Sequence, residues 1–146
     1  MKTVAELLKA KPARRVVSVR PEQSVLEAIK VLAAEDIGAA VVMTGERLAG
    51  IFSERDYTRK VALKGKSSKQ TPVKEILSGQ VIRVSPAHSV EDCMRLMTDH
   101  RVRHLPVSDG DNILGIISIG DLVNWIISAQ TTTIHQLQTY ISGYPG

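Results

Sequence analysis

The sequence contains one structural unit twice, and this duplication limits the possible folds more than any other feature. An offset of 65 residues aligns the two copies without a gap from residue 16 to residue 56 of the first copy. Identical pairs at this offset include Pro21 with Pro86, Ser24 with Ser89, Gly50 with Gly115, Ser53 with Ser118, and Asp56 with Asp121. Upstream, residues 4–8 align with residues 73–77 at an offset of 69, so the linker of the first copy is four residues longer. Self-similarity at a fixed period predicts two copies of one supersecondary unit.

Each copy predicts the same order of elements, a short helix followed by β-α-β-β-α. Thr3 with Glu6 forms a capping box before the first short helix, and Thr71 with Pro72 opens its counterpart. Ser24 and Ser89 cap the central helices, whose apolar residues recur with the spacing of one buried helix face. The predicted strands are 15–19, 39–43 and 48–52 in the first copy and 81–85, 105–107 and 113–117 in the second, and the closing helices are 55–63 and 120–128.

These elements predict an α/β (α+β) chain of two repeats with a helical tail. The first repeat, with its N-terminal helix, covers 1–64, a basic linker covers 65–71, the second repeat covers 72–130, and the tail covers 131–146. Thr133 with Gln136 predicts a separate capped helix in the tail, with Ile134, Leu137 and Ile141 on one apolar face. Such a face needs a partner, either the same chain or a second subunit, and we expect a subunit contact.

Composition restricts the class of protein and its compartment. The chain has 146 residues, a mean hydropathy of −0.01 and a single cysteine, Cys93, which excludes an internal disulfide framework and suits a reducing compartment. No apolar run reaches the roughly 18 residues of a membrane span, and the N-terminus lacks a signal sequence, so we expect a cytoplasmic protein without a membrane anchor. The net charge of +4 makes nucleic acid an alternative partner, but the five scattered aromatic residues do not favour base stacking.

The sequence offers no catalytic constellation and no metal site. No Ser or Cys stands in a nucleophile elbow with a His and an acid to serve it. Cys93 lies on the apolar face of its predicted helix, where a core thiol is expected rather than a metal ligand. Residues 64–68 contain the Gly-Lys-Ser end of a P-loop but lack its first glycine and its preceding strand. We therefore expect a protein that is not an enzyme.

Three stretches of the second copy resemble the second half of a CBS-domain pair. They are the Pro-x-x-Ser-Val helix start at 86–90, His-Arg-Val-Arg-His-Leu-Pro-Val at 100–107 and Gly-Ile-Ile-Ser-Ile-Gly-Asp-Leu at 115–122. The first copy, with Asp-Ile-Gly-Ala-Ala-Val-Val at 36–42 and Gly-Ile-Phe-Ser-Glu-Arg-Asp-Tyr at 50–57, resembles the first half. The resemblance implies two units packed sheet to sheet about a pseudo-twofold axis, usually within a dimer. It also implies a regulatory role, in which clefts between the copies bind AMP, ADP, ATP, NAD or, less expectedly, S-adenosylmethionine and signal to a protein effector.

The resemblance assigns roles to side chains of both copies. Asp56 and Asp121 would accept hydrogen bonds from ribose hydroxyls, and Ser53 and Ser118 would bind phosphate or sugar. The remaining candidates are the phosphate-binding Arg55, Arg101 and Arg103, His104 on the same wall, and the adenine-facing Val17, Ala40, Ile82, Leu105 and Pro106.

Three alternatives remain open for these residues. The Ser-x-x-Asp pairs are also helix-capping patterns, and capping and ligand binding are compatible. The whole chain is alternatively a nucleic-acid-binding module, or a structural dimer whose clefts are filled by side chains. Because Arg55 and Arg103 align with Gly120 and Gly38, we expect the two clefts to differ in size and charge, and such a difference suits a ligand with two different ends, such as NAD.

Overall fold

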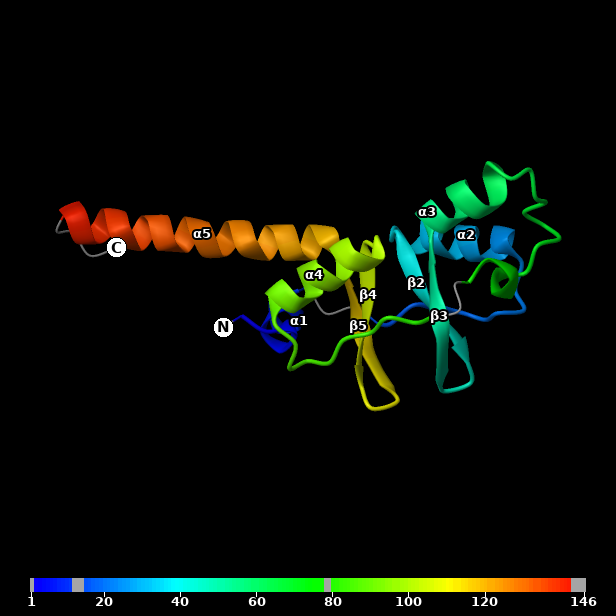
Figure 1. The fold of residues 1–146 in the computed structure, drawn as a ribbon, viewed down its shortest axis with the longest axis horizontal. Coiled ribbons are helices and arrows are strands. Elements are labelled where there is room, and N and C mark those ends of the chain that lie inside the picture. The colour runs from blue at the N-terminus through cyan, green and yellow to red at the C-terminus, as the bar shows by residue number, and fades with distance from the viewer. Residues whose placement is uncertain (1, 12–14, 78–79, 143–146) are drawn as a thin grey trace.

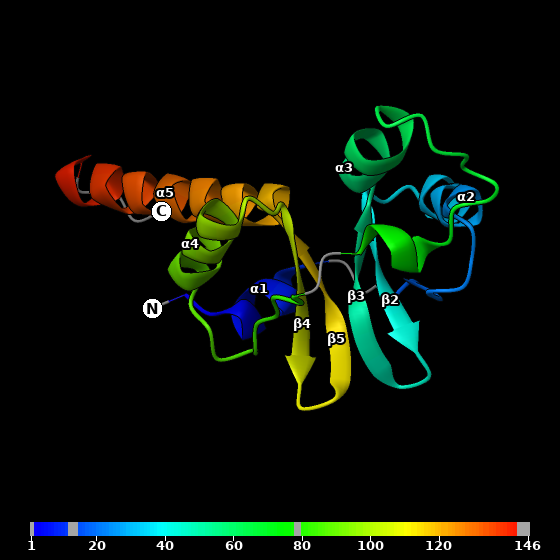
Figure 2. The same cartoon turned by 45° about the vertical axis from the view of Figure 1, so that its right-hand side comes forward.

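Two antiparallel hairpins stand side by side at the centre of the protein, and helices cover their upper ends (Figures 1 and 2). The structure, a computed structural model, describes residues 2–11, 15–77 and 80–142. In the first repeat the elements are β1 (Ser18–Val19), α2 (Val25–Glu35), β2 (Ala39–Thr44), β3 (Arg47–Ser53) and α3 (Glu54–Tyr57), which continues as a π-helical turn (Thr58–Ala62). In the second they are α4 (Val90–His100), β4 (His104–Asp109), β5 (Asn112–Ser118) and α5 (Ile119–Ser142). The mixed helix and strand fold with two small sheets is confirmed.

The two hairpins are built in the same register. In the first, Ala39 pairs with Ser53, and in the second His104 pairs with Ser118, which is the same pair of positions 65 residues later. The strand register shifts at the same place in both hairpins, after Val42 in the β2–β3 pair and after Val107 in the β4–β5 pair. Both α2 and α4 end on a residue in the left-handed region, Asp36 and Arg101, with φ of 54° and 55°. The sequence repeat is therefore a repeat of backbone conformation.

The leading strand is shorter than predicted in both repeats. Over 15–19 only β1 forms, parallel to β2, and over 81–85 there is a single bridge from Val84 to Val107. In the first repeat the N–H of Val41 donates to the carbonyl of Val17 over 3.3 Å. The corresponding position in the second repeat is Pro106, which has no N–H to donate, so the ladder loses this bond.

Each of the two short leading helices packs against the other repeat and not against the repeat that follows it in the sequence. α1 (Val4–Ala10) packs against the second repeat, since Val4 and Leu7 are buried in its hydrophobic core. The 3₁₀-helix Val73–Ile76, a single turn that begins after Pro72, packs in the core of the first repeat. Equivalent hydrogen bonds hold both, from Ala5 N to Pro86 O and from Lys74 N to Pro21 O, each 3.0 Å long. The ranges 1–64 and 72–130 therefore describe units of sequence, whereas each unit in space contains a helix from the other half.

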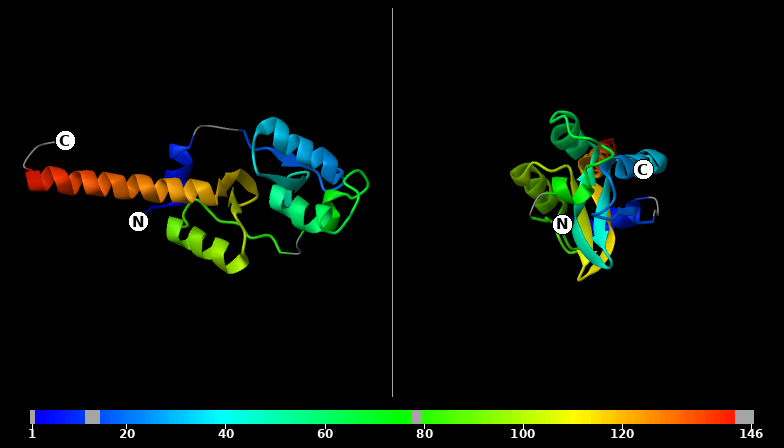
Figure 3. Two further views of the ribbon diagram at one scale, coloured as in Figure 1. Left: turned by 90° about the horizontal axis from the view of Figure 1, so that it is seen from above. Right: turned by 90° about the vertical axis from the view of Figure 1, so that its right-hand side faces the viewer.

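The C-terminal part differs from the sequence prediction. One continuous helix, α5, spans 24 residues, so the prediction of a separate capped helix that begins after Thr133 was wrong. Figure 3 shows α5 extending far beyond the rest of the molecule. Residues 121–142 contain neither proline nor glycine. No helix-breaking residue therefore ends the helix where the repeat ends. Among the described residues no helix is long and apolar enough to cross a membrane.

Candidate functional site

The first candidate side chains lie where β3 passes into α3. The Oγ of Ser53 accepts a hydrogen bond of 3.1 Å from the N–H of Asp56, and the carboxylate of Asp56 accepts one of 3.1 Å from the N–H of Ser53. The Ser53 hydroxyl also donates to Asp56 Oδ2 over 2.9 Å. This capping box confirms the capping interpretation of the sequence pattern. It also fixes the direction of the Asp56 carboxylate, which faces a cavity.

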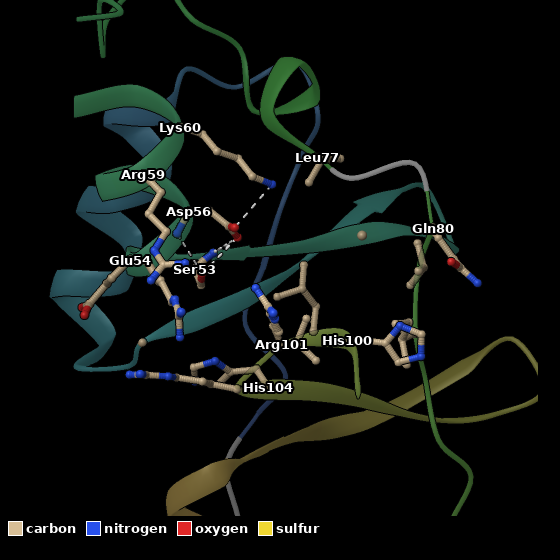
Figure 4. Close-up of a pocket in the computed structure, with 18 residues that line it drawn as sticks. Ser53, Glu54, Asp56, Arg59, Lys60, Leu77, Gln80, His100, Arg101 and His104 are labelled. Carbon is tan, nitrogen blue, oxygen red and sulfur yellow. Dashed lines mark hydrogen bonds and ion pairs between the residues drawn. The ribbon is translucent and has the colours of Figure 1, made fainter. Parts of the chain in front are cut away.

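This cavity, of about 540 Å³, lies between the two repeats (Figure 4). One wall consists of the ends of β3 and α3 from the first repeat. The opposite wall consists of the segment around Ile82 and the residues between α4 and β4 of the second repeat. A ligand in this cavity therefore contacts both halves of the chain. The lining residues include Ser53, Glu54, Arg55, Asp56, Arg59, Lys60, Leu77, Gln80, Ile82, His100, Arg101, Arg103 and His104.

The charge of the lining is predominantly positive. Five side chains of arginine or lysine line the cavity against two carboxylates, those of Glu54 and Asp56. The pKa of Arg55 is below its ordinary value because of desolvation and because Arg59 and Arg103 are near. Arginines brought this close together are suited to an anion with several oxygens, such as a phosphate group.

Lys60 and Asp56 form the ion pair drawn in Figure 4. Lys60 Nζ lies 3.5 Å from Asp56 Oδ1, and the same ammonium donates to the carbonyl of Ile76 over 3.0 Å. The Asp56 side chain retains 29% of its exposed area. The carboxylate of Asp56 is thus partly accessible to a hydroxyl group that enters from the cavity.

The structure brings seven of the predicted site residues to this cavity and leaves six away from it. The seven are Ser53, Arg55, Asp56, Ile82, Arg101, Arg103 and His104. The side chains of Ala40 and Leu105 are fully buried in the cores of their own repeats, Val17 packs against the first core, and Pro106 is buried within β4. Ala40 and Leu105 occupy equivalent positions on the core faces of β2 and β4, and a strand side chain that points into the core does not face the cleft. Adenine contact by Ala40 and Leu105 side chains is therefore not supported.

Ser118 and Asp121 form a second capping arrangement at the start of α5. The N–H of Ser118 donates to Asp121 Oδ2 over 2.8 Å, and Ser118 Oγ accepts from the N–H of Asp121 over 3.1 Å. Lys11, at the end of α1, also donates to Asp121 Oδ2 over 2.8 Å. The pKa of Asp121 is below its ordinary value: burial alone would raise it, but the hydrogen bonds from Lys11 and Ser118 outweigh burial.

His104 lies between the two carboxylate sites. Burial lowers the pKa of its imidazole below the ordinary value, while Asp121, Asp56 and Glu54 act in the opposite direction. Its ring lies close to the first repeat, since a Cβ on Gly38 would be 3.5 Å from His104 Nε2. His104 thus lies at the boundary between the two clefts, which we expect to differ in size and charge.

Two participants, Lys11 and Gln80, were not predicted from the sequence. Lys11 directly follows α1, and Gln80 lies four residues after the 3₁₀-helix Val73–Ile76. The exchange of these helices carries Gln80 to the cavity and Lys11 to Asp121. An offset of 69 pairs Lys11 with Gln80, but only the packing reveals that Lys11 reaches Asp121 and that Gln80 lines the cavity.

A cleft between two β-α-β-β units, with a Ser-x-x-Asp cap at its edge, defines a tandem regulatory repeat. The family model of the CBS domain matches residues 4–63 and 73–128. The chain belongs to the CBS-domain family. No group of three or more potential metal-ligating side chains occurs among the residues that the structure describes.

Individual relatives agree with this assignment. The chain is 39% identical over 127 residues to the mitochondrial CBS domain-containing protein CBSX3 of Arabidopsis thaliana, matching 84% of the chain but only 62% of that protein. A structure of a protein with CBS domains from Burkholderia ambifaria is 50% identical and covers 88% of the chain and 96% of its own, with a TM-score of 0.83. A CBS domain protein from Pyrobaculum aerophilum, solved in complex with AMP, is 27% identical, with a TM-score of 0.69 over 82% of the chain and 88% of its own.

Proposed function

We propose that the chain is a non-catalytic regulatory module that binds an adenine nucleotide in the cavity beside Asp56. The observation that carries this proposal is the combination, in one 540 Å³ cavity, of an exposed carboxylate with five cationic side chains. A carboxylate is a strong acceptor for ribose hydroxyls, and arginines bind phosphate with paired N–H groups. The complex of the Pyrobaculum aerophilum relative with AMP supports the same class of ligand.

The orientation of the nucleotide follows from the distribution of polar groups. The ribose hydroxyls would donate to Asp56, and the phosphates would extend toward Arg55, Arg59 and Arg103, which lie near one another. The base would rest against the apolar part of the lining, which includes Ile51, Leu77 and Ile82. AMP, ADP, ATP and NAD all satisfy this arrangement. S-adenosylmethionine fits less well, because its sulfonium cation would enter a positively charged cavity.

Binding would act as a signal because the ligand connects both repeats. Asp56 belongs to the first repeat and Arg101 and Arg103 belong to the second, so a nucleotide that contacts them favours one relative position of the two halves. The receiver is expected to be another protein that contacts the stabilised arrangement. No step of this mechanism requires bond cleavage or a catalytic group.

A homodimer formed through α5 accounts for the exposed apolar residues of that helix. Ile127, Ile134 and Leu137 are 54%, 55% and 56% exposed, and their separations of seven and three residues match the seam of a helix pair. Asp121 is the single charged residue among positions 119–142, so charge does not oppose the contact. The free, buried Cys93 suits a reducing compartment, and we place the protein in the cytoplasm on that ground.

Thermal unfolding with a panel of adenine nucleotides tests the function. At 100 times its dissociation constant, a ligand of the native state adds about 2.7 kcal/mol to the free energy of unfolding. Asp56→Asn should remove most of the effect while retaining an acceptor for the capping N–H of Ser53. Asp109→Asn makes the same chemical change at the exposed last residue of β4, outside the cavity lining, and should retain the effect. Absence of any response to AMP, ADP, ATP and NAD would refute the proposal, and strong binding to unrelated DNA duplexes instead would favour the nucleic-acid alternative.

A further inference from the structure

The carboxylate of Asp121 has a partner supplied by the chain itself. The ammonium of Lys11 lies 2.8 Å from Asp121 Oδ2 and donates a second hydrogen bond, of 3.0 Å, to the carbonyl of Ile116. Both interactions join residues more than 100 positions apart in the sequence. The pair is partly buried, since 31% of the Lys11 side chain and 23% of the Asp121 side chain remain exposed. A charge-assisted hydrogen bond of normal length in a half-buried place is stronger than an exposed ion pair.

Lys11 is held in this place by the docking of α1. The Lys11 N–H caps α1 by donating to the carbonyl of Leu7 over 3.1 Å, and the Leu7 side chain is 2% exposed in the core of the second repeat. Leu8 lies against the strand at Gly115, where a Cβ would approach its Cδ2 to 3.6 Å. The ammonium is thus delivered by a packed helix next to the strand whose carbonyl it binds.

The equivalent place in the first cleft lacks this cation. If the offset of 69 is extended past the leading helices, Lys11 corresponds to Gln80, which lines the first cavity and carries no charge. The nearest cation there is Lys60, which lies farther from its carboxylate, at 3.5 Å. The Asp56 carboxylate is therefore less closely paired than that of Asp121 and can accept a hydrogen bond from a hydroxyl group.

The phosphate-binding side chains are also confined to one cleft. Arg55, Arg59 and Lys60, which line the first cavity, are replaced in the second copy by Gly120, Asn124 and Trp125. On the opposite wall, His100 and Arg101 are replaced by Glu35 and Asp36. Glu35 is paired with Arg15, and the second cleft has no arginine or lysine at the positions equivalent to Arg55, Arg59, Lys60 and Arg101, so it lacks these phosphate-binding side chains of the first cavity.

We propose that Lys11 is an internal substitute for a ligand at Asp121, so that each chain binds one nucleotide, at Asp56 alone. The second half of this statement rests on the proposed function, whereas the first half does not. Lys11 satisfies the carboxylate that a ribose would otherwise bind, and the second cleft lacks the counterparts of Arg55, Arg59 and Arg101 that would bind phosphate. The Ser-x-x-Asp motif is thus present in both copies, but in the second copy its aspartate binds Lys11 at the end of α1.

Titration of the two aspartates by carboxyl carbon NMR tests the internal pair without any ligand. Lys11→Met removes the ammonium and keeps a side chain of similar length. It should raise the pKa of Asp121 by about 1 or more, as expected for loss of a close opposite charge. Lys9→Met, one of the exposed positions in the last turn of α1, is the matched control and should leave that pKa unchanged. An equal Asp121 pKa in the Lys11→Met variant and the wild type would overturn the proposal.

Calorimetric titration with ADP tests the stoichiometry on the full chain. One ADP per chain is expected, with Asp121→Asn changing the dissociation constant less than about twofold and Asp56→Asn weakening it at least about tenfold. At saturation the Asp56 carboxyl resonance should move and the Asp121 resonance should not. Two ADP molecules per chain, or loss of binding in Asp121→Asn, would overturn the single-site assignment. If no adenine nucleotide moves either resonance, the proposed function and the stoichiometry fail together, while the Lys11→Met titration still decides the internal pair.

Discussion

The backbone N–H of Val4 donates a 2.9 Å hydrogen bond to the carbonyl of His88, and this contact assigns the first helix of the chain to the second repeat. The equivalent bond of the other half runs from Val73 N to Gln23 O, also 2.9 Å. Each repeat is therefore completed by a segment that precedes the other repeat in sequence. Neither repeat buries its full core without the other half of the chain.

Leu7→Ala is expected to destabilise the second repeat more than the first. The Leu7 side chain is 2% exposed in the core that contains Leu105 and Ile117, so its loss leaves a cavity and should cost about 2–5 kcal/mol. Chemical denaturation measures the cost, with exposed Lys9→Ala on the same helix as the control. In native hydrogen exchange, amides of β4 and β5 should lose protection first. Earlier loss in β2 and β3 would contradict the exchange of helices.

Arg103→Gln is expected to weaken ADP binding at least about tenfold, because a hydrogen bond to a charged group contributes about 1.5–3 kcal/mol. Adenosine binding should change much less, since the nucleoside has no phosphate. Arg95→Gln is the control, because Arg95 is an exposed arginine of α4 outside the cavity lining. Calorimetry with both ligands distinguishes the cases, and an equal loss for adenosine and ADP would refute a phosphate role for Arg103.

Acidification is expected to destabilise the ligand-free protein partly through His104. Burial lowers the pKa of this imidazole in the folded state, so the unfolded chain binds the proton more readily. Its stabilising contribution is complete above the unfolded pKa of about 6.5 and is lost as the pH falls below it toward the folded pKa. Thermal unfolding between about pH 7.5 and 5.5 should therefore be less pH-dependent in His104→Gln. Exposed His135→Gln serves as the comparison, and an identical slope in all three proteins would contradict the prediction.

Cys93 is expected to resist thiol reagents in the folded protein. The side chain is fully buried in the core of the second repeat, and desolvation raises the pKa of its thiol to about 11. Because the thiolate is the reactive form, an aromatic disulfide reagent at about pH 8 should react slowly with the native protein. One thiol per chain should react rapidly in guanidinium chloride, since the sequence has a single cysteine. Equal rates in native and unfolded protein would show that this core opens readily.

Leu137→Glu is expected to convert a dimer to a monomer. The substitution places a charge in the proposed helix contact, where Leu137 is 56% exposed in the single chain. Light scattering after size-exclusion chromatography gives the mass, and Gln138→Glu adds the same charge at the neighbouring exposed position as a control. A monomeric wild type, or a dimer that survives Leu137→Glu, would exclude α5 as the contact.

The repeat made much of the local structure predictable. The helix caps at Ser24 and Ser89 form where the sequence predicts them. The hairpins and the capping box of Ser53 with Asp56 do so too, because caps and turns depend on neighbouring residues. The short first strand of the second copy has a local cause as well, since Pro106 cannot donate the expected ladder bond. Helix α5 was predicted poorly at its centre, because the cap pattern at Thr133 lies in a stretch, 121–142, that contains no proline or glycine to end the helix.

By itself, the sequence determined that the chain folds as two equivalent units, each with a Ser-x-x-Asp cap between a strand and a helix. Only the tertiary structure decided that α1 packs on the far repeat, that Lys11 reaches Asp121, and that Arg103 and Asp56 line one cavity. Capping and strand pairing within a hairpin act between residues close in sequence, so their pattern is visible there. The partner of a charged side chain about 100 residues away depends on how packed units cross, and no local pattern records that crossing.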